Sequence, residues 1–223
     1  AMNAGSLRAA RLASAAAVQA VDLVCTGQVH NAFCNVRPPG HHAETDRAMG
    51  FCLFNGITVA AAHARRVFGL ERIVIIDFDV HYGNGTADIV GADPNTLVLH
   101  SYGYPLYPDQ NPPSSANQIR VPLPNGSDGA YAQQAMTAAW LPALQRFQPE
   151  LVLISAGFDA HRDDPLAQLN WQDDDYRWVT RLIGEHTQRS AQGRVISVLE
   201  GGYSLPALGR CAALHVAELV AIG

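Results

Sequence analysis

Two carboxylates and an imidazole recur at every second position near the middle of the chain. They are Asp77, Asp79 and His81, at the end of an apolar run that begins at Ile73. In a strand, residues two apart point to the same face, so the three side chains are expected on one side. Carboxylates at the rim of a core repel each other and resist ionisation, whereas a divalent cation offsets their charges. Because Asp and His together favour zinc or a similar first-row ion, the spacing predicts a metal site with Asp79 and His81 as two ligands.

The same spacing allows a structural interpretation, in which the carboxylates cap a turn and His81 is a buried, hydrogen-bonded histidine. Three further strand-like runs argue against it, because they also end in polar turns that contain glycine. These turns are RPPGHHAE with His41 and His42, SAGFDAHRDDPL with Asp159, Asp163 and Asp164, and EGGYS with Glu200 and Tyr203. In parallel sheets, ligands bind beyond the carboxyl ends of the strands. A catalytic zinc takes three protein ligands and leaves a position for water, and Asp164 is predicted as the third.

The elements that must position these residues alternate along the chain. Apolar strand-like runs are predicted at 31–36, 72–79, 96–101, 151–157 and 194–200. Helical spacing is found at 55–69, 129–147, 173–190 and 206–221, and an alanine-rich helix is predicted near the N-terminus. This alternation predicts an α/β fold, an open and mainly parallel sheet with helices on both faces. The proline-rich stretch 102–118 is predicted to be a long loop of the functional kind.

Composition excludes several other classes of protein. Apolar residues make up 48% of the 223 residues and charged residues 16%, which is typical of a globular domain. A net charge of -5 argues against nucleic acid as a partner, because phosphate binding requires a basic surface. No apolar run reaches the ~18–20 residues of a membrane span, so no membrane association is expected. Four cysteines without a C-x-x-C pair indicate reduced thiols and a cytoplasmic protein.

Four motifs together resemble the histone deacetylase family, most closely its class II branch and the bacterial deacetylase-like and acetylpolyamine amidohydrolases. The motifs are RPPGHHAETDRAMGFCLFN, IIDFDVHYGNGT, ISAGFDAHRDDPLA and LEGGY, in the family's order. The resemblance implies the open parallel sheet that this family shares with arginases. It also implies an enzyme, a zinc-dependent amidohydrolase that removes acetyl or other short acyl groups from acetyl-lysine-like amines. The implied partners are an acetylated lysine peptide or protein, or an acetylated polyamine.

The resemblance also implies a role for each matching residue. Zinc is expected on Asp79, His81 and Asp164, and a structural potassium ion near Asp77, with Ser101 as one ligand. The expected catalytic residues are His42 as general acid–base, His41 beside it, Asp77 holding His41, Asn84 facing His42, and Tyr203 donating to the substrate carbonyl. The expected substrate channel is formed by Gly50, Phe51 and Tyr107. His161 and Asp163 are expected at the surface of their turn.

One domain is expected, covering 1–223, and it lacks the N-terminal segment that this family usually has. Because the absence of that segment would leave an apolar surface uncovered, we expect this surface to be covered by another copy of the chain, in a homo-oligomer, or by a separate segment. Two other functions stay open: an acetylpolyamine deacetylase, and a catalytically impaired binding domain with the same fold. A manganese ureohydrolase fits less well, since its motif requires Asp where this chain has Gly83 and a D-x-D where it has Asp159 and His161.

Overall fold

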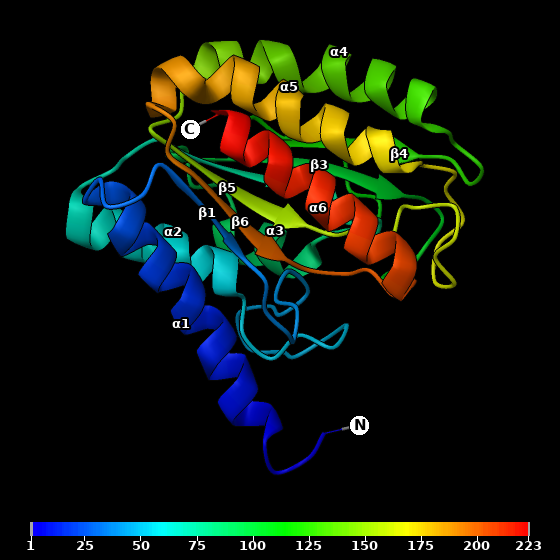
Figure 1. Cartoon of the computed structure of the whole chain (residues 1–223), viewed down its shortest axis with the longest axis horizontal. Helices are drawn as coiled ribbons and strands as arrows, with labels where there is room; N and C mark the ends of the chain where they lie inside the picture. The colour runs from blue at the N-terminus through cyan, green and yellow to red at the C-terminus, as the bar shows by residue number, and fades with distance from the viewer. Residues whose placement is uncertain (1, 223) are drawn as a thin grey trace.

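Strand β2 (Ile73–Asp77) lies inside the sheet because both of its faces are apolar. The computed structural model describes residues 2–222, and there it contains a single six-stranded sheet in the order β1-β6-β5-β2-β3-β4. All five neighbouring pairs are parallel, which confirms the predicted open parallel sheet. The other strands are β1 (Asn31–Cys34), β3 (Thr96–Gly103), β4 (Gln118–Leu123), β5 (Leu151–Ala156) and β6 (Val195–Leu199) (Figure 1).

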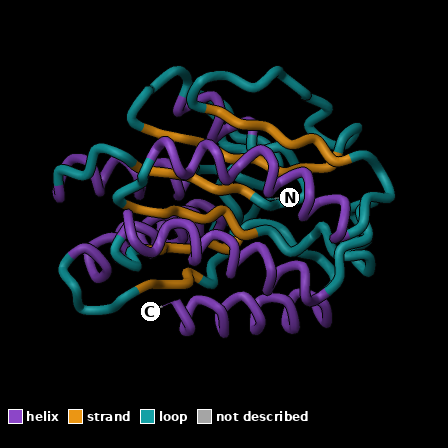
Figure 2. Tube along the Cα trace, turned by 90° about the horizontal axis from the view of Figure 1, so that it is seen from above, coloured by secondary structure: helices purple, strands orange, loops and turns teal. Residues whose placement is uncertain are grey.

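Helices cover both faces of this sheet, as predicted. Val74 and Ile76 of β2 pack with α4, α5 and α6, whereas Ile73 and Ile75 pack with α1 and α2 on the other face. Figure 2 shows the strands as a layer with helices on either side. The helices are α1 (Ser6–Cys25), α2 (Gly56–Phe68), α3 (Asn84–Val90), α4 (Gly129–Phe147), α5 (Asp173–Ala191) and α6 (Leu205–Ile222).

Helix ends follow local capping signals. The Asn55 side chain accepts a hydrogen bond from Thr58 N at the start of α2, and the Asp128 side chain accepts one from Tyr131 N at the start of α4. Two short elements were not predicted from the sequence. Strand β4 contains Pro122, which an edge strand tolerates, and the seven-residue α3 lies inside the metal motif, where its glycine and threonine weaken any helical pattern.

Helix α6 corrects the expectation that no segment is apolar enough to cross a membrane. Its 18 residues have a mean hydropathy of 1.5, which meets the length and composition of a span. Its inner face, however, binds the rest of the domain through polar groups. Buried His215 contacts the hydroxyls of Ser197 on β6 and Thr180 on α5, at 2.8 and 2.6 Å. This face of α6 packs against α5 and the sheet, and 22% of the 18 residues are buried there.

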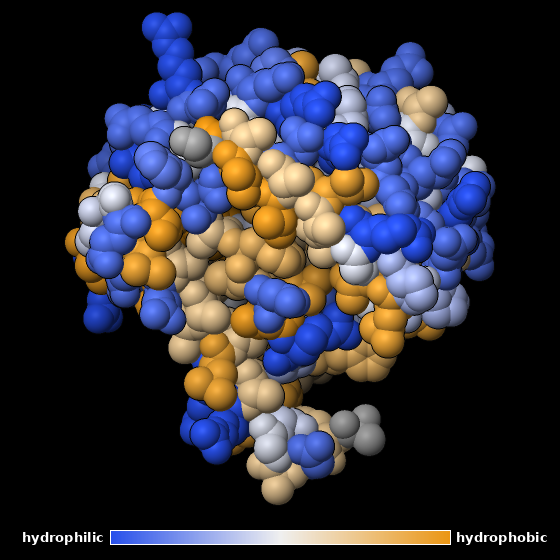
Figure 3. All heavy atoms as spheres, in the orientation of Figure 1, coloured by the Kyte–Doolittle hydropathy of each residue, from blue (hydrophilic) through white to orange (hydrophobic). Residues whose placement is uncertain are grey.

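An apolar surface remains around the open edge of β1. Helices α1 and α6 both contact this edge strand, and the first half of α1 extends away from the body of the domain (Figure 1). Figure 3 shows apolar side chains gathered over this region. The exposed apolar residues of the two helices are Leu7, Leu12, Leu205, Val216 and Val220. We call these five side chains the α1–α6 surface.

Candidate functional site

The polar turns follow four neighbouring strands and lie together at the carboxyl ends of these strands. β1, β6, β5 and β2 are consecutive in space, and they are parallel, so their carboxyl ends lie together. The turns that follow them contain the tandem histidines, Tyr203, Asp159, and the pair Asp79 and His81. The structure thus brings together segments that are up to about 160 residues apart in sequence, as in Glu200 bound to Gly40 with a separation of 160.

Three buried side chains converge at the centre of this edge. The Nδ1 atom of His81 lies 3.0 Å from Asp79 Oδ1 and 3.1 Å from Asp159 Oδ2. One imidazole nitrogen carries at most one hydrogen, so it cannot serve both carboxylates. Accordingly, Asp159 Oδ2 is buried without a hydrogen-bond partner among residues 2–222. Two carboxylates and an imidazole around an unpartnered oxygen match the donor set of a first-row divalent cation.

The backbone after β6 approaches this cluster closely. Gly201 N donates to Asp79 Oδ2 at 2.7 Å. A Cβ at Gly201 would lie 2.0 Å from Asp159 Oδ2 and 2.6 Å from Asp79 Oδ2, so only glycine can occupy this position. The first glycine of the LEGGY motif thus reflects the space that the carboxylates need.

Asp164, the predicted third ligand, lies outside the cluster. Its Oδ2 accepts hydrogen bonds from Tyr203 N at 2.7 Å and Ser204 N at 3.2 Å, and its Oδ1 accepts one from Leu166 N at 3.0 Å. The carboxylate therefore holds the turn that carries Tyr203. The structure places Asp159 where Asp164 was expected, because Asp159 follows β5 directly while Asp164 lies beyond a further bend of the loop.

The predicted strand over 72–79 also ends earlier than expected. β2 ends at Asp77: Phe78 N still donates to Ser155 O of β5, but from Asp79 onward the N–H groups donate to carboxylates instead of to a neighbouring strand. Asp79 N donates to Asp77 Oδ1 at 3.1 Å, Val80 N to Asp159 Oδ1 at 2.9 Å, and His81 N to Asp79 Oδ1 at 2.8 Å. The three side chains consequently do not share one strand face. Asp77 has a hydrogen-bond partner of its own.

That partner is His41, as the family resemblance implied. Its Nδ1 atom lies 3.0 Å from Asp77 Oδ2, and both side chains are buried. Burial opposes a charge on His41, but the carboxylates of Asp79 and Asp77 raise its pKa well above the ordinary value. His41 is therefore held as an imidazolium next to the metal-type cluster.

His42 has the opposite electrostatic character. Burial and the charge of His41 lower the pKa of His42 to about 3, so its imidazole is neutral. Its Nδ1 lies 2.7 Å from Asn84 Oδ1, and Asn84 Nδ2 donates to Glu44 Oε1 at 2.6 Å. Because Glu44 can only accept, the amide oxygen must face His42, whose Nδ1 therefore carries the hydrogen. Its Nε2 is left as a free base. Sequence reasoning missed Glu44, although it belongs to the GHHAE motif.

A cavity of about 450 Å³ opens in front of these groups. Its lining residues are His42, Gly50, Phe51, His81, Leu106, Tyr107, Leu166 and Tyr203. The structure thus brings all three predicted channel residues to the cavity, along with Leu106 and Leu166, which the motifs did not indicate. Phe51 has a φ of 66°, a left-handed conformation that non-glycine residues rarely adopt, and the residue is 67% exposed. Such strain is typical of functional sites.

The predicted potassium site lies beside Asp77, on the neighbouring strand β3. In the sheet register Asp77 is paired with His100, and Ser101 follows it. The Ser101 hydroxyl and both ring nitrogens of His100 are buried without a hydrogen-bond partner in the described part of the chain. Burial lowers the pKa of His100 to about 3, so this ring is neutral. The region therefore offers unpaired polar atoms, of which the sequence indicated only Ser101.

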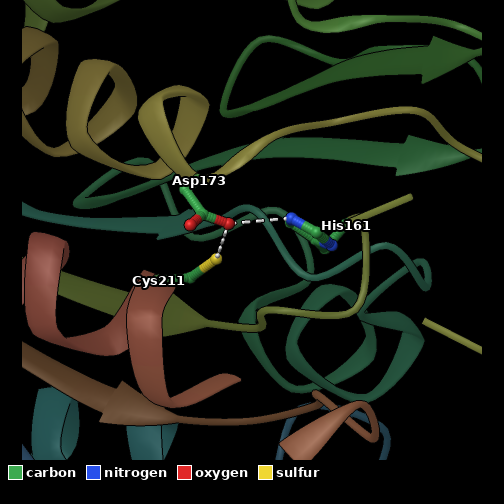
Figure 4. Close-up of side chains that lie close together, drawn as sticks. All are labelled: His161, Asp173 and Cys211. Carbon is green, nitrogen blue, oxygen red and sulfur yellow. Dashed lines mark hydrogen bonds and ion pairs between the residues drawn. The ribbon is translucent and has the colours of Figure 1, made fainter. Parts of the chain in front are cut away.

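A second group of ligand-type side chains joins His161, Asp173 and Cys211 (Figure 4). His161 is only 3% exposed, which corrects the expectation that it lies at the surface, whereas the Asp163 side chain is 51% exposed as expected. His161 Nδ1 accepts from Asp163 N, and His161 Nε2 lies 2.9 Å from Asp173. Both ring nitrogens of His161 therefore have hydrogen-bond partners other than Asp159. Burial raises the pKa of Cys211 to about 12, so its thiol stays protonated. The contacts of Asp173 with His161 and Cys211 hold the loop after β5 against α5 and α6.

Comparisons with known proteins agree with this geometry. The family model described as histone deacetylase domain matches residues 1–219. A histone deacetylase-like amidohydrolase from Pseudomonas aeruginosa is 39% identical over 96% of this chain and 59% of its own length. The polyamine deacetylase HDAC10 of Mus musculus is 40% identical over 95% of this chain and 33% of its own length. The chain therefore spans less than two thirds of the first relative's length and about a third of the second's.

A solved structure is similar over nearly the whole chain as well. The crystal structure of the HDA15 HD domain superposes with a TM-score of 0.89 at 34% identity, over 96% of this chain and 62% of that one. This similarity confirms the deacetylase-type α/β fold that the motifs predicted. With the family model matching all but the last four residues, the chain belongs to the histone deacetylase family.

Proposed function

We propose that this domain hydrolyses acyl amides, removing acetyl or another short acyl group from acetyl-lysine-like amines with a zinc ion. One observation carries the proposal: the unpartnered carboxylate oxygen of Asp159 lies with Asp79 and His81 at a cavity that neutral His42 also lines. These three residues would hold the ion. When bound, zinc would polarise the acyl carbonyl and lower the pKa of water toward about 7.

The protein residues divide the proton chemistry between them. His42 is neutral, with Nε2 free, so it can take a proton from water and later give one to the departing amine. His41, held as imidazolium by Asp77, stabilises negative charge that develops nearby. The Tyr203 hydroxyl donates to the substrate carbonyl, and burial keeps it protonated by raising its pKa. The products are a short carboxylic acid and a free amine.

We also propose a structural potassium ion beside Asp77. Its support is the pair of unpartnered polar residues there, of which the Ser101 hydroxyl offers an oxygen ligand. The ion would leave His41 and Asp77 in place and would not enter the reaction.

The test of the proposed function combines turnover with metal analysis. The purified protein should release acetate from a fluorogenic acetyl-lysine substrate, lose this activity on chelation and regain it with one equivalent of zinc. A protein that binds zinc and substrate without turnover would instead be a catalytically impaired binding domain. A protein that needs two manganese ions would indicate a ureohydrolase.

Gly50 provides a first mutational prediction. A Cβ at this position would lie 2.1 Å from Cδ2 of His42, and the residue has a φ of 50°. Gly50→Ala should therefore displace the His42 ring and lower kcat about 10²-fold, the usual cost of a misplaced catalytic group. Zinc content should stay at one equivalent. Gly126→Ala, at a positive φ with nothing near its Cβ, is the matched control; a normal kcat for Gly50→Ala would contradict the geometry.

The cavity lining favours acetyl-lysine over acetylated polyamines. None of its eight residues is acidic, so it offers no countercharge to the extra ammonium groups of a polyamine. Its aromatic walls accommodate a slim aliphatic chain. We expect kcat/KM on an acetyl-lysine peptide to exceed that on N-acetylputrescine by about tenfold or more, ~1.4 kcal/mol. A tenfold preference for the polyamine would refute this choice of substrate and leave the deacetylase proposal standing.

We further propose that two copies associate through the α1–α6 surface. Exposed apolar side chains on both sides of an open edge strand are typical of contact surfaces. Sedimentation should show a dimer that Leu12→Glu converts to a monomer. Val67→Glu, at a similarly exposed position on α2, should leave the dimer intact. A monomer at all concentrations would contradict the proposal.

A further inference from the structure

We propose that Arg37 and Glu200 act as positioning residues that fix the distance between His42 and Tyr203; the inference rests on the proposed deacetylase function. His42 ends a turn that begins at Arg37 after β1, and Tyr203 lies in a turn that begins at Glu200 after β6. The two strands are neighbours in the sheet, so the turns leave it side by side. One side chain from each turn forms hydrogen bonds with the backbone of the other turn.

Glu200 binds the histidine turn. Its Oε2 accepts hydrogen bonds from Gly40 N at 2.6 Å and His41 N at 3.1 Å, and its Oε1 accepts one from the Ser155 hydroxyl at 3.1 Å. The side chain is only 1% exposed. Burying a carboxylate is costly unless its oxygens are satisfied, so these bonds hold the side chain and the turn in one arrangement. The bound N–H groups lie just before His42.

Arg37 makes the return contact to the tyrosine turn. Its guanidinium donates to the backbone oxygen of Glu200 at 2.7 Å. The same guanidinium lies 5.5 Å from the centroid of the Tyr203 ring, within the range of a cation–π contact. Arg37 thus binds both the backbone at the start of this turn and the aromatic ring that ends in the reactive hydroxyl.

The two contacts matter for catalysis because His42 and Tyr203 must act on the same substrate carbonyl. A misplacement of about 1 Å between such groups costs about 10²-fold in rate. Neither Arg37 nor Glu200 lines the 450 Å³ cavity. Arg37 lines a neighbouring pocket that shares Gly50 and Phe51 with it, and its guanidinium contacts the Tyr203 ring and the backbone of the tyrosine turn. We therefore expect both residues to act on the reaction through the positions of the two turns.

The experiment compares an acetyl-lysine peptide with its trifluoroacetyl counterpart. Fluorine withdraws electrons and stabilises the oxyanion, so the second substrate depends less on the Tyr203 hydroxyl. Arg37→Met and Glu200→Ala should each lower kcat about 10²-fold on the acetyl peptide and by no more than about tenfold on the trifluoroacetyl peptide. KM and zinc content should change little. Glu200→Gln keeps an acceptor oxygen for the two N–H groups and should restore most of the rate.

Glu150 offers a matched control at the opposite edge of the sheet. Its Oε2 also accepts from two successive N–H groups, those of Glu71 and Arg72, both at 2.9 Å. Glu150→Ala should leave kcat on both peptides unchanged. Equal losses on the two peptides in Glu200→Ala, with a parallel fall in Tm, would show a purely structural role and overturn the proposal.

A spectroscopic readout separates this proposal from the proposed function. If the wild-type protein hydrolyses neither peptide, the deacetylase function fails, yet the turn contact can still be measured. Glu200→Ala should shift the imidazole NMR resonances of His42, whereas Glu150→Ala should not. Unchanged His42 resonances in Glu200→Ala would overturn the positioning role.

Discussion

Asp159→Ala is expected to lose its zinc, whereas Asp164→Ala is expected to keep it. Asp159 Oδ2 lies 3.1 Å from His81 Nδ1, and it is the carboxylate oxygen of the cluster that no donor satisfies. Changes to groups that only support metal ligands already cost about 10–100-fold in affinity, so loss of a ligand should cost at least about 10²-fold. Zinc content after dialysis, measured by mass spectrometry, gives the comparison directly.

Asp164→Ala should instead lower the stability of the protein. Its carboxylate accepts the N–H groups of Tyr203 and Ser204, so its removal should loosen the tyrosine turn and lower the free energy of unfolding by about 1–3 kcal/mol. Asp163→Ala, at the adjacent half-exposed aspartate, is the control for both variants. Zinc retained in Asp159→Ala but lost in Asp164→Ala would reverse the ligand assignment.

Tyr203→Phe is expected to lower kcat about 10²–10³-fold, about 3 kcal/mol of barrier, with zinc content unchanged. The substitution keeps the ring that lines the cavity and lies 6.3 Å from the Phe51 ring, and it removes only the hydroxyl. Tyr107→Phe removes a hydroxyl from another aromatic residue of the cavity and should have a much smaller effect. Steady-state kinetics of the two variants give the two values of kcat for this comparison. Equal turnover in Tyr203→Phe and wild type would assign Tyr203 a purely structural role.

The layers of the fold could be predicted from the sequence because burial leaves a periodic pattern. Ile73 to Ile76 are apolar on both faces of β2, which indicates an internal strand, and the spacing within 129–147 matches α4 at both ends. Strand β4 was missed because an edge strand needs no continuous apolar run, and its pattern alternates between buried and exposed positions around Pro122.

The site was predictable as a region and less so in its contacts. The family resemblance indicated His41, His42, Tyr203 and the three channel residues, all of which the structure brings to the carboxyl ends of the strands. They could not show which aspartate of DAHRDD reaches the cluster, because the path of an irregular loop depends on hydrogen bonds distant in sequence. Asp164 is turned away by N–H groups about 40 residues further along the chain, at Tyr203 and Ser204.

The position of β6 in the sheet delays completion of the site while the chain is being synthesised. Although β6 is the last strand in sequence, it is inserted between β1 and β5. While the chain is being synthesised, the carboxylates of Asp79 and Asp159 exist long before Gly201 can donate to one of them. The centre therefore cannot be completed until the ribosome has released residues beyond Tyr203. Contacts of such large sequence separation slow folding, so β1 and β5 stay unpaired along these edges until β6 has been synthesised.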